Sequence, residues 1–248
     1  MSGHNRWSKI KHKKAASDAK KSKGWTKYIK EITMCARSGA DPSGNPRLRA
    51  AIDKARGENM PADTIQRAIK KGSGELEQVS YEELVYEVYG PGGTAIVVDI
   101  LTDNRNRTAS EIRFLLERNN GKLANAGSVT YLFKKRGTIV FDSHGIDEDK
   151  LMEAALELGA EDIQTQEGMT QVLTSPGSFY DVKEALEKKG FKPQAGEVGM
   201  IADTHVRLEG KEATQMAKLM TQLEDHDDVQ NVYVNADIDE AVFEQLAE

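Results

Sequence analysis

The sequence predicts an α+β multidomain protein: an N-terminal all-helical domain followed by two ferredoxin-like α+β domains, one inserted in the other. Two observations support this prediction. Apolar residues recur with helical spacing in the first 75 residues, whereas strand and helix patterns alternate in the rest. The charge also changes sign there, because residues 1–75 carry 18 Lys and Arg against 7 Asp and Glu, and the remainder carries 16 against 33.

The N-terminal domain, residues 1–75, is predicted to hold three helices. Asn45 and Pro46 suit the cap and first residue of the second helix, and Pro61 can open the third. Two cations and a glycine end the third helix, so residues 72–74 are predicted to be a linker. The first helix has an apolar face with a 3.6-residue period, formed by Trp25, Tyr28, Ile29, Ile32, Cys35 and Ala36.

The rest of the chain predicts a split domain, residues 80–136 plus 204–248, around an inserted domain, residues 137–203. The insert shows a complete βαββαβ order of strand and helix patterns. The flanking segments give a second βαββαβ order when they are joined. Their predicted strands are 94–101, 129–133, 204–208 and 229–234, and their predicted helices are 108–119 and 211–223.

One turn of the split domain is a candidate anion site, and a second resembles one only superficially. Residues 102–108 end a strand and open a helix, which fits a polar turn with an N-cap. The alternative is a secondary anion site in which Asn104, Arg105 and Arg107 lie beside free backbone N–H groups. Thr108 and Glu111 have the spacing of a capping box, which predicts that the helix begins after Thr108. Residues 90–93 lack the phosphate-loop pattern and predict a tight turn between strands.

Several classes of protein are disfavoured. The opening residues contain no apolar run and no segment approaches the length of a membrane span, so we expect a cytoplasmic protein. The single cysteine, Cys35, lies on an apolar helical face and predicts a core residue. The scattered histidines and missing hydrolase motifs predict no enzyme, no cofactor and no metal. The acidic stretch 224–228 predicts a solvated helix end, with cation binding as the alternative.

The candidate nucleic-acid site lies in residues 4–30. Residues 1–30 hold ten Lys and Arg against one acid, Asp18. Such crowding costs self-repulsion, which nearby phosphates relieve as counterions are released. A solubilising tail is the alternative. Trp7 suits either stacking or packing, whereas Trp25 is expected in the core. The predicted contacts are His4, Arg6, Trp7, Lys9, Lys11, His12, Lys13, Lys14, Lys20, Lys21, Lys23, Lys27 and Lys30.

Motifs along essentially the whole chain resemble the YebC/PmpR family. Two mild departures are Asn5-Arg6 and Trp25, which keep the charge and aromatic character. The resemblance implies three domains around a broad cleft and a cytoplasmic bacterial regulator, labelled a probable DNA-binding transcriptional regulator. The matching segments are 3–14, 45–49, 59–61, 68–74, 89–93 and 102–108.

Two functional hypotheses therefore stand beside the disfavoured enzyme. The first is a DNA-binding transcriptional regulator, although the sequence shows no helix-turn-helix with base-reading residues. The second is a translation factor that binds ribosomal RNA. The resemblance implies this alternative too, since mitochondrial relatives act in translation and bacterial members are linked to stalled ribosomes. The sequence does not separate the two hypotheses, and it does not specify an oligomeric state.

Overall fold

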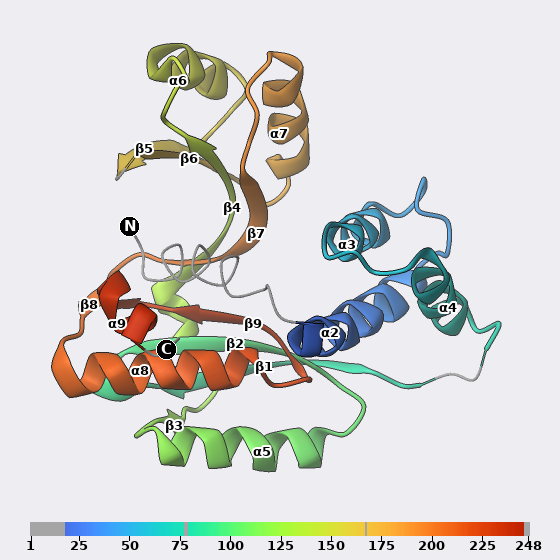
Figure 1. The fold of residues 1–248 in the computed structure, drawn as a ribbon, viewed down its shortest axis with the longest axis vertical. Coiled ribbons are helices and arrows are strands. Elements are labelled where there is room, and N and C mark those ends of the chain that lie inside the picture. The colour runs from blue at the N-terminus through green and yellow to red at the C-terminus, as the bar shows by residue number, and fades with distance from the viewer. Residues whose placement is uncertain (1–17, 77–78, 167, 246–248) are drawn as a thin grey trace. The chain divides into compact units, whose positions relative to one another are not determined.

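The computed structural model describes residues 18–76, 79–166 and 168–245, and the chain divides into two compact units (Figure 1). Residues 131–205 form one of them, the inserted unit. The described residues before residue 131 and after residue 205 form the other, the main unit. The predicted helical and split domains both fall in the main unit, so their division at residue 75 stays a prediction. None of the described helices is long and apolar enough to cross a membrane.

The described part of the main unit begins with the helices α2 (Asp18–Ala36), α3 (Pro46–Gly57) and α4 (Ala62–Ser73). The Asn45 side chain caps α3 by accepting a hydrogen bond from the Leu48 backbone N–H at 3.0 Å, as predicted. The apolar side chains predicted to face inward on these helices pack into one core. The buried members are Ile32, Cys35, Ala36, Leu48, Ala51, Ile52, Ala55, Met60, Ile65, Ala68 and Ile69.

The predicted linker at residues 72–74 is wrong. Gly72 and Ser73 form the last turn of α4, and Gly74 ends the helix with a left-handed φ of 89°. A Cβ atom at Gly72 would press on the Thr33 carbonyl oxygen and lie 2.7 Å from the Cβ atom of Ala36. Gly72 is therefore a packing residue that lets α4 approach α2 closely, which the local pattern of glycines could not show.

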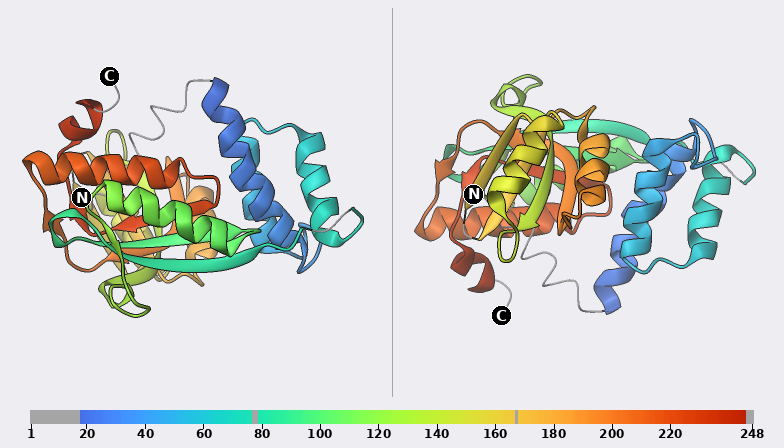
Figure 2. Two further views of the ribbon diagram at one scale, coloured as in Figure 1. Left: turned by 90° about the horizontal axis from the view of Figure 1, so that it is seen from below. Right: turned by 90° about the horizontal axis from the view of Figure 1, so that it is seen from above.

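The four-stranded sheet of the main unit has the antiparallel order β3-β1-β2-β9. Helices α5 and α8 lie side by side on one face of this sheet, and buried residues from both join one apolar core (Figure 2, left). The turn at residues 90–93 joins β1 to β2, as predicted. The elements are β1 (Glu82–Tyr89), β2 (Ala95–Thr102), α5 (Arg105–Arg118), β3 (Lys122–Leu123), α8 (Gly210–Glu224) and β9 (Val229–Val234).

The second βαββαβ order predicted for the flanking segments is wrong. Residues 130–132 form a 3₁₀ turn instead of a strand. The predicted strand 204–208 shortens to β8 (Val206–Arg207), which pairs only with β10 (Ala236–Asp237), before α9 (Glu240–Gln245). The reason for the first error is Glu87, whose buried carboxylate accepts the N–H groups of Gly127, Val129 and Thr130 at 2.5–2.9 Å. These donors are satisfied without a strand partner.

This carboxylate is held in its charged form. Burial raises the pKa of Glu87, but the backbone N–H groups of Val129, Gly127 and Thr130 outweigh that effect and lower the pKa to about 2. The segment that leads out of the main unit is thus fastened to β1 by a buried charge.

The inserted unit follows the predicted order of strands and helices. Its antiparallel sheet has the order β5-β6-β4-β7, and α6 and α7 pack on it through a separate apolar core (Figure 2, right). The Asp147 side chain caps α6. The elements are β4 (Phe133–Asp142), α6 (Glu148–Glu157), β5 (Asp162–Gln166), β6 (Met169–Thr174), α7 (Phe179–Lys188) and β7 (Ala195–Ala202).

Candidate nucleic-acid interface and the Asp228 network

Most of the predicted contact residues lie outside the side chains that the structure describes. Lys27 and Lys30 on α2 are the described members of that set, and both turn toward the loop between α8 and β9. The Lys27 Nζ donates to the Glu224 carbonyl oxygen. Lys30 is only 8% exposed, donates to the Asp227 carbonyl oxygen at 2.9 Å and forms an ion pair with Asp228. A phosphate contact by Lys30 would require this ion pair to open.

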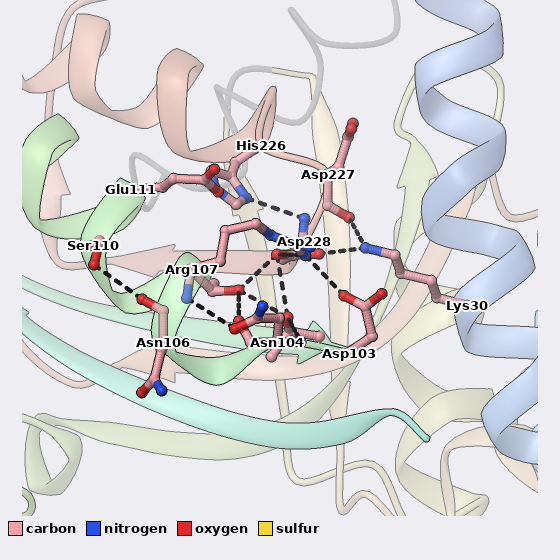
Figure 3. Close-up of polar contacts among 12 residues, drawn as sticks. Lys30, Asp103, Asn104, Asn106, Arg107, Ser110, Glu111, His226, Asp227 and Asp228 are labelled. Atoms are coloured by element: carbon pink, nitrogen blue, oxygen red, sulfur yellow. Dashed lines mark hydrogen bonds and ion pairs between the residues drawn. The ribbon is translucent and has the colours of Figure 1, made fainter. Parts of the chain in front are cut away.

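Asp228 is the centre of a buried polar network (Figure 3). Its side chain is 2% exposed. The Oδ2 atom accepts from Arg107 Nη2 at 2.8 Å, from the Thr108 hydroxyl at 2.6 Å and from the Thr102 hydroxyl at 3.2 Å. The Oδ1 atom pairs with Lys30. Burial raises the pKa of Asp228, but the hydrogen bonds from Arg107, Lys30 and Thr108 prevail and hold the pKa far below its usual range.

The network joins three segments that are distant in sequence. Lys30 comes from α2, and Asp228 immediately precedes β9. Thr102 ends β2, and Thr108 lies in the first turn of α5. The carboxylate therefore connects the helical segment to the sheet of the main unit. Sequence reasoning missed Asp228, because residues 224–228 were expected to form a solvated helix end. For Asp228 that expectation is wrong; its position directly before an apolar strand was the available signal.

The turn at residues 102–108 caps α5 in a different way from the one predicted. The Asn104 side chain accepts the Arg107 backbone N–H at 3.1 Å, so the helix begins at Arg105. The predicted capping box of Thr108 and Glu111 is wrong, since the Thr108 hydroxyl is bonded to Asp228 and Glu111 faces His226 at 2.9 Å. Asn104 serves as the cap four residues earlier.

The structure brings the predicted anion-site residues together at the N-terminus of α5. Arg107 pairs with Asp103 at 2.9 Å as well as with Asp228, and hydrogen bonds to these two carboxylates raise its pKa above the usual value. Arg105 is exposed and lies 3.7 Å from Glu82. The anion held by Arg107 is thus a carboxylate of the protein itself, and binding of an external anion by Asn104, Arg105 and Arg107 stays a prediction.

Glu111, His226 and Asp228 place three potential metal-ligand atoms within 4.8 Å of one another. His226 and Asp228 already have partners for their ligand atoms. His226 Nδ1 accepts the Asp228 backbone N–H at 3.1 Å, so Nε2 carries the proton that faces Glu111. The Asp228 oxygens pair with Lys30 and Arg107. The arrangement is chemically a hydrogen-bonded network that orients the loop before β9.

The residues expected in the helical core are found there. Trp25 is half-buried against the core and donates through Nε1 to the Glu58 carbonyl oxygen at 3.2 Å. Cys35 is buried, and burial raises the pKa of its thiol to about 11. The thiol is therefore neutral at physiological pH, which suits a packing residue and not a nucleophile.

The exposed cations of α3 and α4 fall into two groups. Arg47, Lys54 and Arg56 lie beside Glu83, Glu31 and Asp53, respectively. Arg49, Arg67 and Lys70 are exposed and make no ion pair within the described residues. On α4, Arg67 and Lys70 share the outer face, opposite the buried Ile65 and Ile69. These cations add exposed positive charge outside the predicted residues 4–30.

The fold and this network define a mixed α/β protein with antiparallel sheets and a basic helical segment at its N-terminal side. Residues 5–75 match the family model described as the TACO1/YebC protein N-terminal domain, and residues 81–236 match the model of the TACO1/YebC second and third domain. The chain belongs to the TACO1/YebC family, which confirms the resemblance found in its motifs.

Relatives and a solved structure match nearly the whole chain. A probable transcriptional regulatory protein of Geobacter sulfurreducens is 57% identical over 247 residues, or 99% of this chain and 100% of that protein. A protein of the same description from Treponema pallidum is 53% identical over 239 residues, or 96% and 98%. The crystal structure of a conserved hypothetical protein from Aquifex aeolicus has a TM-score of 0.79 at 42% identity, covering 90% of this chain and 92% of that one.

Proposed function

We propose that this protein is a non-enzymatic regulator that binds nucleic acid through its basic first 75 residues. The observation that carries the proposal is the concentration of charge, with 18 Lys and Arg against 7 Asp and Glu in this segment and a net −17 in the remainder. Phosphates relieve the mutual repulsion of such cations and release counterions, which makes binding favourable at moderate salt.

The geometry supports a folded basic surface. Helices α2, α3 and α4 share one apolar core, and Arg49, Arg67 and Lys70 project from it without ion pairs among the described residues. The charge of Lys30 is paired with the buried Asp228 carboxylate. The predicted contacts before residue 24, together with these cations of α3 and α4, are therefore the proposed phosphate-binding set.

DNA is the proposed target, because relatives more than 50% identical over almost the full chain are named probable transcriptional regulatory proteins. A cytoplasmic location and the absence of a cofactor belong to the same proposal. Ribosomal RNA is the alternative target, and it uses the same phosphate chemistry. Phosphate contacts position a protein on nucleic acid but do not read its sequence.

Charge reversal tests the proposal directly. The variant with Lys9→Glu, Lys11→Glu, Lys13→Glu and Lys14→Glu should lose binding to DNA fragments and to ribosomes, measured by fluorescence anisotropy and by co-sedimentation. The matched control reverses Lys150, Lys183, Lys188 and Lys189, which are ion-paired in the inserted unit. The control should bind as the wild type does. Equal binding by both variants would refute the proposal.

Crosslinking in cells, followed by sequencing of bound DNA and bound RNA, separates the two targets. Discrete promoter peaks are expected for the transcriptional regulator. Crosslinks dominated by ribosomal RNA would instead support the alternative function, a translation factor.

A further inference from the structure

Helix α5 carries an exposed aromatic residue between two arginines. Thr108, Ile112 and Leu116 bury one face of the helix in the core of the main unit. On the solvent side, Phe114 is 57% exposed, and the guanidinium carbon of Arg118 lies over its ring at 5.4 Å from the centroid. The exposed part of this ring, with a guanidinium group beside it, offers an apolar and positively charged surface to a binding partner.

The charge of α5 is opposite to that of its surroundings. The helix holds four arginines and two glutamates, whereas residues 76–248 have a net charge of −17. Arg113 and Arg118 make no ion pair within the part of the chain that the structure describes. Glu111 faces His226 at 2.9 Å. Glu117 lies four residues after Arg113 without pairing with it, so the charges of both arginines remain available.

A second aromatic group lies close to this surface. Tyr86 on β1 is partly buried, which raises the pKa of its phenol, while the positive charges of Arg105 and Arg113 act in the opposite direction. Arg113 is therefore close enough to the Tyr86 phenol on β1 for its charge to act on it, and Phe114 follows Arg113 along the helix. Unpaired cations interleaved with aromatic rings are typical of surfaces that bind single-stranded nucleic acid.

We propose that the outer face of α5, comprising Arg113, Phe114 and Arg118, is a second nucleic-acid contact that binds an unpaired stretch of the strand. A base stacks on the exposed part of the Phe114 ring, and the two guanidinium groups bind the flanking phosphates. A single strand fits better than a duplex, since the faces of paired bases are hidden in the stack. This inference rests on the proposed function, because it assumes that the basic N-terminal segment brings the nucleic acid to the protein.

The stacking contact is tested with Phe114→Ala. The control is Tyr180→Ala on α7, because Tyr180 is similarly exposed at 52%. Binding is measured by fluorescence anisotropy with a labelled RNA single strand, the DNA single strand of the same sequence and its duplex. Loss of one base stack should weaken single-strand binding by Phe114→Ala about tenfold, with no change for Tyr180→Ala. The RNA and DNA strands show which sugar the surface prefers.

The phosphate contacts are tested with Arg113→Gln and Arg118→Gln together. The control removes the same charge through Lys183→Gln and Lys188→Gln, two ion-paired lysines of α7. Two lost phosphate contacts should reduce the slope of log K against log salt by about 1.4 for a single strand. The control should leave this slope unchanged.

The outcomes separate this inference from the proposed function. Wild-type binding that survives Phe114→Ala unchanged would overturn the α5 contact alone. An equal loss for the duplex and the single strand would overturn base stacking. If the wild-type protein binds none of the three probes, the proposed function falls and the α5 contact falls with it.

Discussion

The cations around Asp228 and the cations on the outer face of α4 share chemistry but not surroundings. Lys30 and Arg107 pair with the Asp228 carboxylate, which is 2% exposed. Threonine hydroxyl groups donate further hydrogen bonds to it. Arg67 and Lys70 face solvent and make no ion pair within the described residues. Both groups raise the basic count of the sequence equally, yet only the second group is free to meet a phosphate.

The difference has an energetic basis. An ion pair on the surface contributes at most about 1 kcal/mol to stability, because water and salt already solvate both charges. A buried pair is different, since removing one partner leaves a charge without compensation in a medium of low polarity. The Asp228 network should therefore govern stability, whereas the exposed cations should govern binding.

The largest expected effect is that of Asp228→Asn. This change leaves Lys30 and Arg107 without their common counterion, and it should lower the free energy of unfolding by about 3 kcal/mol. The control is Asp227→Asn, since the side chain of Asp227 is exposed and the network uses its backbone carbonyl. Urea unfolding followed by circular dichroism measures both variants. Similar midpoints for the two would show that the network does not stabilise the fold.

The stabilising effect of Asp228 should also depend on pH. Because its pKa is lower in the folded protein than in the unfolded chain, the contribution is complete above the unfolded pKa of about 4. The contribution is lost as the pH falls below that value. The difference between wild type and Asp228→Asn should thus shrink in acid, as urea midpoints between pH 7 and pH 3 would reveal. A constant difference would contradict the assignment of the charge.

A smaller effect is expected from Arg107→Ala. Asp228 keeps Lys30 and the threonine hydroxyls, so the expected loss is about 1.5 kcal/mol, the range of a hydrogen bond to a charged group. The matched control is Arg105→Ala, whose exposed ion pair with Glu82 should contribute less than about 0.5 kcal/mol. The same urea titration compares them. A larger loss of stability for Arg105→Ala than for Arg107→Ala would show that the pair with Asp228 does not stabilise the fold more than an exposed pair does.

The smallest effect on stability is expected from Arg67→Gln combined with Lys70→Gln. The urea midpoint should stay unchanged, because neither side chain has a partner to lose among the described residues. The affinity for duplex DNA should fall, and two lost phosphate contacts should reduce the slope of log K against log salt by about 1.8. Lys150→Gln with Lys188→Gln controls for the change in net charge. An unchanged slope of log K against log salt would show that the outer face of α4 does not contact DNA.

Local patterns predicted much of the fold. The apolar periods of α2, α3 and α4, the cap at Asn45 and the order of elements in the inserted unit were all readable, because neighbouring residues specify them. Two of the failures occurred where a distant group supplied a hydrogen bond, and the predicted linker failed where Gly72 packs against α2. The Glu87 carboxylate accepts hydrogen bonds from backbone N–H groups of residues 127–130, which therefore need no strand partner. The Thr108 hydroxyl donates to Asp228 and does not form the predicted cap.

The sequence by itself determined the helical and strand periods, the core faces, the charge asymmetry and the family. Tertiary structure decided which charges are available. Lys30 and Asp228 are 198 residues apart, and Arg107 is 121 residues from Asp228. No local pattern can reveal such a pairing, because burial and hydrogen-bond partners arise only when the segments pack together. The basic segment is thus visible in the sequence, but the part of it that remains free to bind a phosphate is visible only in the folded chain.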